Sequence, residues 1–307
     1  MLFGQNDLCY ASSMSPIRIA IIAVLVVFLT VFVIWHVIPA FRGEIDLLPG
    51  FHAGPVFIRF YGLLMAAAVL VGFFIASRYA PKFGIEKKLI EGVLPWIVVF
   101  GFIGARLYYV IFSWAQFQDN PFDILMVWKG GLAIYGGIIG AAVGVVIYAR
   151  RFGMQIMAFM DVFALGLPLA QSIGRWGNFF NQEAFGAPTA LPWGMYIEPR
   201  FRPFEYLFFQ SFHPTFLYEA LWNIIVFLSL LYLVRTGVSD SPGRLAGAYF
   251  ILYAIGRYFI ESLRLDSFFV DSFRVDQITS LVMMLIGSVI LFISYYAQKA
   301  KQTAKID

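Results

Sequence analysis

Eight long apolar runs divide the sequence, and each is about the length that a helix needs to cross a bilayer. Short charged links separate them. The chain is 61% hydrophobic and only 13% charged, whereas soluble domains carry about 25% charged residues. We therefore expect an all-α polytopic membrane protein. The runs cover approximately residues 18–38, 55–78, 92–114, 131–149, 156–173, 215–234, 245–263 and 277–297.

The charges of the links predict the orientation of the chain in the membrane. If the N-terminus is cytoplasmic, most basic link residues fall inside and the acidic ones fall outside, as the positive-inside rule requires. Both termini are then cytoplasmic, and the longest link, residues 174–214, lies on the outer face of a bacterial inner membrane. The inner set is Arg78, Lys82, Lys87, Lys88, Arg150, Arg151, Arg235, Arg244, Lys299, Lys301 and Lys305, and the outer set is Asp46, Asp119, Asp123, Asp266, Asp271 and Asp276.

The apolar pattern also predicts the domain organisation. The first run exceeds the 7–15 residues, roughly, of a signal-peptide core, so we interpret it as an uncleaved signal-anchor helix. It belongs to an N-terminal extension, residues 1–50. A membrane domain follows over residues 51–298, with a head region at about 174–214. Residues 299–307 form a basic cytoplasmic tail.

The composition argues against several cofactors and partners. One cysteine, Cys9, allows neither an intramolecular disulfide nor a cysteine-based metal site. The three histidines, His36, His52 and His213, are scattered rather than grouped as zinc ligands. The net charge is only +4, and the basic residues lie between apolar runs rather than in one patch. We expect no metal, no other cofactor and no nucleic-acid partner.

A dense polar cluster directly follows the fifth apolar run. Arg175, Asn178, Asn181 and Glu183 alternate there with glycines and aromatic residues. A charged side chain inside a bilayer costs about 2.5–3.5 kcal/mol, so such residues need a partner or a function. Arginine can bind phosphate through two parallel hydrogen bonds, and glycine lets a ligand approach closely. An interfacial arginine with amide caps is the structural alternative, but the density of polar groups favours a ligand site.

A second cluster lies in the seventh run. Tyr253, Arg257, Glu261 and Arg264 are spaced at i, i+4, i+8 and i+11, which places them on one face of a helix. Arg257 and Glu261 could form a purely structural ion pair. We favour the alternative, in which Arg257 enters a polar cavity and Glu261 holds its guanidinium in place.

Two further polar residues stand apart from these clusters. Arg106 lies inside the third run without a local acid, so it must reach an acid or carbonyl on another helix, or a lipid headgroup. Functional and structural interpretations of Arg106 are evenly matched. His213 precedes Pro214 and Thr215, which are typical of a helix start, and a structural role is the more common one for histidine in that setting. Tyr218 and Glu219 follow one turn later.

The fourth run carries glycines at a fixed interval. Gly136, Gly140 and Gly144 recur every four residues, which is the small-xxx-small pattern of closely packed membrane helices. We expect these glycines to serve packing rather than chemistry.

Together these residues resemble the prolipoprotein diacylglyceryl transferase family. The longest match is Gly174-Arg175-x-Gly177-Asn178-Phe179-x-Asn181-x-Glu183-x-x-Gly186. The resemblance covers about residues 50–298 and implies a core of seven membrane helices with a small periplasmic head, so that the first run is an added helix. Further matches, in the family's order, are Tyr61-Gly62-Leu63, Gly104-x-Arg106, Asp161, His213-Pro214-Thr215-x-x-Tyr218-Glu219 and Arg257-x-x-x-Glu261-x-x-Arg264.

The resemblance also implies an activity and its partners. The family transfers the sn-1,2-diacylglyceryl group of phosphatidylglycerol, a membrane lipid, to the lipobox cysteine thiol of a preprolipoprotein signal peptide. A thioether forms and glycerol-1-phosphate leaves, which is the first step of bacterial lipoprotein maturation. We assign catalytic roles to Arg175, Arg257, Tyr135 and Glu183. We assign substrate binding to Tyr61, Arg106, Asn178, Asn181, Gly186, His213, Tyr253, Glu261 and Arg264.

One position departs from the family pattern. The family often carries histidine in the motif Gly-Gly-x-x-x-His-Gly, whereas Tyr135 occupies that place in the stretch 130–136. Phenols ionise near pH 10 and are poor bases at neutral pH. Either Tyr135 only positions the substrate or a nearby arginine activates it. The general base that takes the thiol proton could therefore be Tyr135, Glu183 or a phosphate oxygen of the lipid.

A function from another class also deserves comparison. Arginine and glutamate inside the membrane, next to broken glycine-rich segments, would suit a transporter for an anionic solute. Such a transporter is expected to show an inverted repeat, and we find none in the sequence. The transferase is the preferred interpretation.

Overall fold

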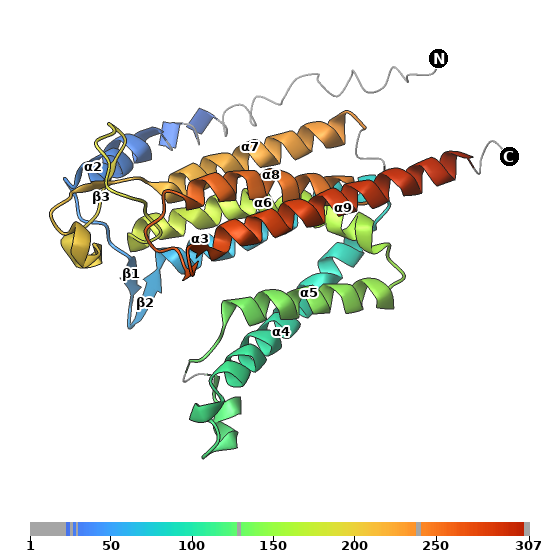
Figure 1. The fold of residues 1–307 in the computed structure, drawn as a ribbon, viewed down its shortest axis with the longest axis horizontal. Coiled ribbons are helices and arrows are strands. Elements are labelled where there is room, and N and C mark those ends of the chain that lie inside the picture. The colour runs from blue at the N-terminus through green and yellow to red at the C-terminus, as the bar shows by residue number, and fades with distance from the viewer. Residues whose placement is uncertain (1–22, 25–26, 29, 128–129, 238–240, 304–307) are drawn as a thin grey trace.

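The helical class is confirmed by a computed structural model, which describes all residues except 1–22, 25–26, 29, 128–129, 238–240 and 304–307 (Figure 1). Within the first apolar run, residues 18–22, 25–26 and 29 lie outside the described residues. Its described end forms a π-helical turn, η2 (Val33–Val37), which continues into α2 (Ile38–Arg42). Phe41 of α2 packs against Phe179 and Phe216, so this segment joins the rest of the fold.

Each of the other seven apolar runs coincides with a helix. In the described part of the chain, five helical segments are long and apolar enough to cross a membrane: Phe60–Phe83, Lys87–Phe112, Ile156–Asn181, Thr215–Arg235 and Val275–Ala300. The helices are α3 (Phe60–Tyr79), α4 (Lys87–Phe112), α5 (Ile134–Arg151), α6 (Ile156–Asn181), α7 (Thr215–Arg235), α8 (Arg244–Glu261) and α9 (Val275–Thr303). The 18-residue helices α5 and α8 are not among the five, so their crossing remains a prediction.

Short elements fill the links between these helices. Three antiparallel hairpins pair β1 (Gly50–Ala53) with β2 (Val56–Arg59), β3 (Met195–Tyr196) with β4 (Ser211–Phe212), and β5 (Phe269–Val270) with β6 (Phe273–Arg274). Single 3-10 turns are η3 (Ala80–Phe83), η4 (Trp114–Gln116), η5 (Pro121–Leu125), η7 (Pro199–Phe201) and η8 (Phe204–Tyr206).

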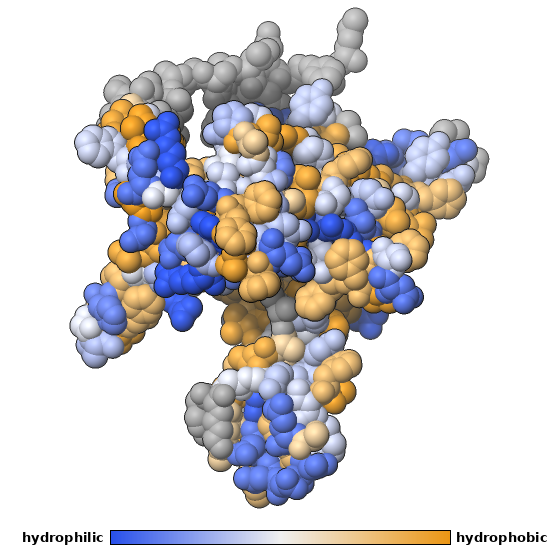
Figure 2. All heavy atoms as spheres, turned by 60° about the vertical axis from the view of Figure 1, so that its left-hand side comes forward, coloured by the Kyte–Doolittle hydropathy of each residue, from blue (hydrophilic) through white to orange (hydrophobic). Residues whose placement is uncertain are grey.

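Five helices form the main bundle, in which α3, α6, α7, α8 and α9 lie side by side (Figure 1). Leu165, Leu230 and Leu245 are fully buried between α6, α7 and α8. Glycines bring two helix pairs into close contact, α3 with α6 at Gly72 and Gly166, and α8 with α9. Many large apolar side chains remain exposed, and Figure 2 shows hydrophobic residues spread over the face in view. This surface suits contact with lipid tails.

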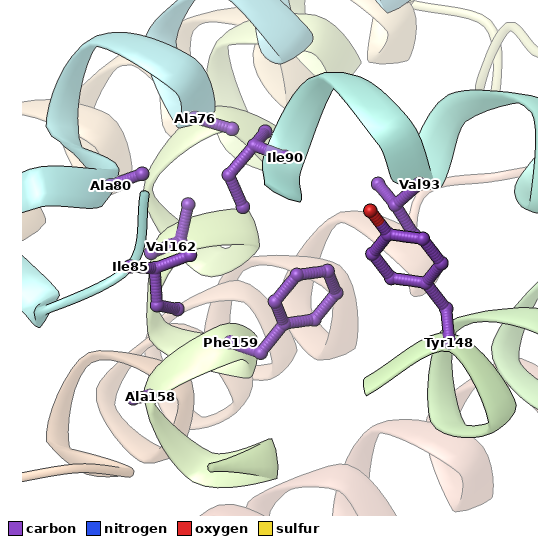
Figure 3. Close-up of a cluster of buried hydrophobic side chains, with 9 residues drawn as sticks. All are labelled: Ala76, Ala80, Ile85, Ile90, Val93, Tyr148, Ala158, Phe159 and Val162. Atoms are coloured by element: carbon purple, nitrogen blue, oxygen red, sulfur yellow. The ribbon is translucent and has the colours of Figure 1, made fainter. Parts of the chain in front are cut away.

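The α4–α5 hairpin leaves the bundle and projects away from it (Figure 1). Its root is fixed by a buried apolar cluster at the start of α4, the end of α5, the start of α6 and the end of α3. Figure 3 shows these side chains converging from the four elements. The hairpin therefore joins the bundle at one end, and its tip lies apart. The cluster comprises Ala76, Ala80, Ile85, Ile90, Val93, Tyr148, Ala158, Phe159 and Val162.

The predicted glycine packing is confirmed at the α4–α5 interface. A Cβ built on Gly136 or Gly140 would lie closer than 3.0 Å to backbone atoms of α4, which real Cβ atoms essentially never do. Gly144 would likewise press on Phe100. The absence of side chains at these positions is therefore what lets the two backbones touch.

Replacing Gly140 by alanine should separate α4 from α5 and destabilise the protein by about 1–3 kcal/mol, which is the usual cost of overpacking. Gly137→Ala is the matched control, because a Cβ there would meet Ala105 Cβ at 3.6 Å and the Gly101 backbone oxygen at 3.7 Å, which are ordinary van der Waals contacts. Thermal unfolding of both variants in one detergent measures the difference. Equal melting temperatures for the two variants would contradict this account of the interface.

Helix α6 is longer than the sequence predicted. The apolar run was expected to end near residue 173, but α6 continues to Asn181. Gly177 faces the ring of Tyr61 on α3 within van der Waals distance, and Gly174 faces Met65. Close packing against α3 offsets the poor helix propensity of these glycines. As a result Arg175 and Asn178 project from a helix rather than from a loop.

Candidate active site

A buried carboxylate lies where the end of α6, the start of α7 and the end of α8 meet. Glu219, in the second turn of α7, has a side chain only 4% exposed. Among the described residues, three arginines contact it. Its Oε2 lies 2.6 Å from Nη2 of Arg175, and its Oε1 lies 2.8 Å from Nη1 of Arg257 and 3.3 Å from Nη1 of Arg264. We call these four residues, together with Glu261, the Glu219 cluster.

Arg257 is the most heavily paired arginine of the Glu219 cluster. Besides Glu219, its Nη2 lies 2.8 Å from Oε2 of Glu261 and 2.5 Å from Oδ2 of Asp276 at the start of α9. The Glu261 side chain is only 1% exposed. The expected grip of Glu261 on the Arg257 guanidinium is thus present. Arg257 ties α7, α8 and α9 together at one point.

Arg264 lies just beyond the end of α8 and still reaches the cluster. Its guanidinium donates to both carboxylate oxygens of Asp266, at 2.9 and 2.7 Å. Burial alone would raise the pKa of Asp266, but the hydrogen bond and the charge of Arg264 outweigh it and lower that pKa. Arg274 of β6 donates to the backbone oxygens of Glu261 and Arg264 and so fixes the end of α8.

Glu183 is held by two asparagines of α6. Nδ2 of Asn178 and Nδ2 of Asn181 both donate to its Oε1, at 2.9 and 3.2 Å. The neighbouring residues Gln182 and Ala184 have positive φ angles of 50° and 54°. Such backbone angles are uncommon for residues other than glycine and concentrate at functional sites. Asn178, Asn181 and Glu183 of the predicted polar cluster therefore form one hydrogen-bonded group, whereas Arg175 pairs with Glu219.

The loop after Glu183 is fixed by contacts from distant segments. Thr215 Oγ1 donates to the backbone oxygen of Ala184, and the backbone N–H of Gly186 donates to the oxygen of His213 at 2.8 Å. A Cβ on Gly186 would lie 2.7 Å from the Leu263 oxygen, so only glycine fits there. Gly186 thus has a packing role next to the site.

His213 belongs to a chain of side-chain hydrogen bonds. Trp193 Nε1 donates to the Tyr218 hydroxyl at 2.9 Å, and that hydroxyl lies 3.1 Å from Nδ1 of His213. Because the Tyr218 oxygen already accepts from Trp193, its own proton is free to point to Nδ1. This arrangement orients the imidazole beside the loop that carries Glu183.

Tyr61 and Tyr253 lie beside different parts of the candidate site. Tyr61 packs on Gly177, one helical turn before Asn181. Tyr253 lines a small cavity together with Glu219 and Arg257. Tyr61 therefore lies against the last turns of α6, and Tyr253 lies beside Glu219 and Arg257.

Arg106 and Tyr135 lie elsewhere, toward the tip of the α4–α5 hairpin. Arg106 donates to four backbone oxygens, of Asp123, Ile124, Gly130 and Gly131, at 2.6–2.8 Å. Of the partners considered from sequence, backbone carbonyls are the ones found, and they hold the hairpin's connecting loop. Tyr135 is 60% exposed in the first turn of α5. In the described chain no ion pair or hydrogen bond links either residue to the Glu219 cluster.

Arg175 is the arginine of the cluster that can accept a new ligand. Its side chain is 25% exposed, against 12% for Arg257 and 11% for Arg264. Only Nη2 of Arg175 contacts a carboxylate in the described part of the chain, and its other donors have no hydrogen-bond partner among the described residues. An anion such as a phosphate group could take two of them at once. No group of histidine, cysteine, aspartate and glutamate suited to a metal ion occurs among the described residues.

Comparison with known proteins decides the family. The sequence profile described as "Prolipoprotein diacylglyceryl transferase" matches residues 50–293, which is most of the chain. The chain belongs to this family. The family match begins after the first apolar run, as the sequence analysis expected, and the transporter alternative is not favoured.

Curated relatives in the family carry one name. "Phosphatidylglycerol--prolipoprotein diacylglyceryl transferase" of Synechococcus elongatus is 44% identical over 76% of this chain and 82% of its own length. The protein of that name from Thermosynechococcus vestitus is 45% identical, over 80% of this chain and 92% of its own. The one from Fervidobacterium nodosum is 42% identical, over 84% and 86%. The chain is thus a transferase-family member over nearly the whole length of these relatives.

Sequence reasoning missed several residues that the structure brings to the site. Asp276 was assigned only to an outer link, and Gln182, Trp193, Glu198 and Arg274 were not singled out. Gln182 exchanges hydrogen bonds with Glu198, its Nε2 donating to Oε1 and its Oε1 accepting from the Glu198 backbone N–H, at 2.6 and 2.7 Å. A polar residue directly after Asn181 was the available signal for Gln182. The others lie too far away in sequence for spacing to reveal them.

Proposed function

We propose that this protein transfers the diacylglyceryl group of phosphatidylglycerol to the lipobox cysteine of preprolipoproteins. The names of its relatives give the lipid and the prolipoprotein as substrates of those proteins. The observation that carries the proposal here is Arg175, a half-paired guanidinium beside a cluster of fixed arginines. That arrangement suits a lipid whose headgroup is an anionic phosphodiester.

The reaction replaces a carbon–oxygen bond by a carbon–sulfur bond. The cysteine thiolate attacks the glycerol carbon that bears the phosphate, and the bond from that carbon to the phosphate oxygen breaks. The electron pair stays on that oxygen, and glycerol-1-phosphate leaves with one more negative charge than the phosphodiester had. Positive groups placed where this charge develops lower the barrier.

Arg175 and Arg257 supply that positive charge in our proposal. Arg175 binds the phosphate through its free donors. Arg257, whose guanidinium is fixed by three carboxylates, adds positive charge on the far side of Glu219. Positive charge also favours the thiolate over the thiol, so only a weak base is needed. Glu183 is a candidate for that base, because two asparagines orient one oxygen and no described residue contacts the other.

Substrate binding extends around these residues. The residues that we propose to line the substrate side of the site are Tyr61, Asn178, Asn181 and Gly186. The residues that we propose to support the site from the opposite side are His213, Tyr253, Glu261 and Arg264. Arg106 acts at the hairpin tip, either on the loop alone or with a lipid headgroup. The proposed location is the inner membrane, with the Glu219 cluster toward the outer leaflet and both termini cytoplasmic, on the strength of the link charges.

Tyr135 should contribute less than a general base would. Removing such a base costs about 100–10,000-fold in turnover. We expect Tyr135→Phe to lower turnover by less than about tenfold, because the hydroxyl touches no member of the Glu219 cluster. Tyr135→His restores the side chain common in the family and should match or exceed the wild type. A loss above 100-fold in Tyr135→Phe would instead make the phenol essential.

The proposed function is tested with purified protein, phosphatidylglycerol vesicles and a synthetic lipobox peptide. We expect the peptide mass to increase by one diacylglyceryl group, with one glycerol phosphate released per peptide. A peptide with serine in place of the lipobox cysteine is the acceptor control, and phosphatidylethanolamine is the donor control. Absence of the thioether product with wild-type protein would refute the function.

A further inference from the structure

One buried carboxylate holds the arginines that would bind phosphate. The two oxygens of Glu219 contact different arginines, Oε2 meeting Arg175 and Oε1 meeting Arg257 and Arg264. The helices that carry these residues, α6, α7 and α8, lie side by side in Figure 1. Glu219 thus sets the separation between Arg175 and Arg257, which would act on the same phosphate group.

The contact with Arg175 differs from the contact with Arg257. Arg257 Nη1 donates a well-angled hydrogen bond to Oε1 at 2.8 Å. Arg175 meets Oε2 at 2.6 Å as an ion pair, but the angles of a hydrogen bond are not met at this buried oxygen. Arg175 is therefore held mainly by charge and can turn its donors toward another anion without losing a hydrogen bond.

The charges of the cluster show what Glu219 contributes. Arg175, Arg257 and Arg264 are positive, and Glu219 and Glu261 are the carboxylates that are almost fully buried beside them. Asp266 and Asp276 are about half exposed, so solvent screens them more. Without Glu219 the arginines would present a much stronger positive field to any phosphate at Arg175.

We propose that Glu219 is a positioning residue that also weakens the hold of the site on its phosphate product. This inference rests on the proposed function. The lipid phosphodiester carries one negative charge, whereas a phosphate monoester carries nearly two at pH 7. A fixed carboxylate beside Arg175 therefore repels the product more than the substrate. Glu219 both aligns the arginines for the reaction and promotes departure of glycerol phosphate.

The direct test measures binding of two soluble anions without turnover. Glycerol phosphate stands for the product, and glycerophosphoglycerol, the deacylated lipid headgroup, stands for the monoanionic substrate. Isothermal titration to Glu219→Gln should give a glycerol phosphate Kd at least about tenfold lower than the wild type. The Kd of glycerophosphoglycerol should fall less. Turnover should drop about tenfold or more, because Arg175 and Arg257 lose their common anchor and the product is retained.

Two further proteins keep the test decisive. Glu219→Asp keeps the charge but shortens the reach, so turnover should fall while the Kd of glycerol phosphate stays within about threefold of the wild type. Glu91→Gln removes an exposed carboxylate, which pairs with Lys87 on α4, and should change neither quantity. If neither Glu219 variant folds, the same titrations on the wild type still test the inference. The wild type should bind glycerol phosphate no more tightly than glycerophosphoglycerol.

A purely structural Glu219 would behave differently. Glu219→Gln would then lose turnover with an unchanged or higher Kd for glycerol phosphate, and this result would overturn the inference. A wild type that binds glycerol phosphate more tightly than glycerophosphoglycerol would overturn it as well. Failure of the proposed function is distinguishable, because the thioether would then be missing in the wild type whatever the binding data show.

Discussion

Arg175→Ala is expected to lower turnover by about 100- to 1000-fold while the fold persists. Removing one group that stabilises developing charge costs about this much in other enzymes. Arg175 is the arginine of the Glu219 cluster with donors left over for a phosphate. Glu219 keeps Arg257 and Arg264 as partners when Arg175 is lost, so its charge stays compensated. Thioether formation followed by mass spectrometry measures the effect.

A matched arginine separates this effect from a general loss of charge. Arg200, in the loop between α6 and α7, is exposed and pairs with Glu198 at 2.8 Å. Arg200→Ala should keep turnover within about twofold of the wild type. Arg175→Lys should recover only part of the activity, because lysine cannot make two parallel hydrogen bonds to one phosphate. Full activity in Arg175→Ala would remove this residue from the mechanism.

Arg257→Ala should destabilise the protein by about 3–5 kcal/mol, the usual cost of breaking a buried ion pair. Its guanidinium contacts Glu219, Glu261 and Asp276, so its loss leaves the almost fully buried Glu261 with a single, 3.9 Å ion-pair contact, to Arg264, in the described chain. Thermal unfolding in detergent, followed by the helical circular-dichroism signal, measures the loss of stability. Activity should fall too, but part of that fall reflects the fold.

Arg42→Ala provides the comparison for stability. Arg42 and Glu44 form an ion pair 3.7 Å long in which both side chains are more than half exposed. Pairs of this kind contribute about 0–1 kcal/mol. A similar melting temperature for Arg42→Ala and Arg257→Ala would contradict the view that the Glu219 cluster holds α7, α8 and α9 together.

The sequence predicted contacts within one helix better than contacts between helices. Arg257 and Glu261 are four residues apart on α8, so their pairing follows from helix geometry alone. Glu219 lies 38 residues from Arg257, and no spacing rule indicates which face of α7 turns toward α8. The resemblance placed Glu219 in a motif, but its contacts with three arginines became visible only when the helices were packed.

The same distinction explains the remaining differences. The fifth apolar run was expected to end near residue 173, yet packing of Gly174 against Met65 and of Gly177 against Tyr61 accompanies the continuation of α6 to Asn181. Arg106 could not be assigned a partner because its four carbonyls lie 17 to 25 residues further along the chain. The apolar runs, in contrast, predicted the helices from α3 onward, since hydrophobic length is a local property.

The position of the lipid phosphate is the most direct test of a site centred on Arg175. An experimental structure of the protein in nanodiscs with phosphatidylglycerol, determined with a non-reactive serine form of the lipobox peptide, would locate it. We predict headgroup density within hydrogen-bond distance of the Arg175 guanidinium, with the peptide serine near the phosphate-bearing carbon. Headgroup density bound elsewhere, for example at Arg106 on the hairpin tip and far from Arg175, would contradict the account.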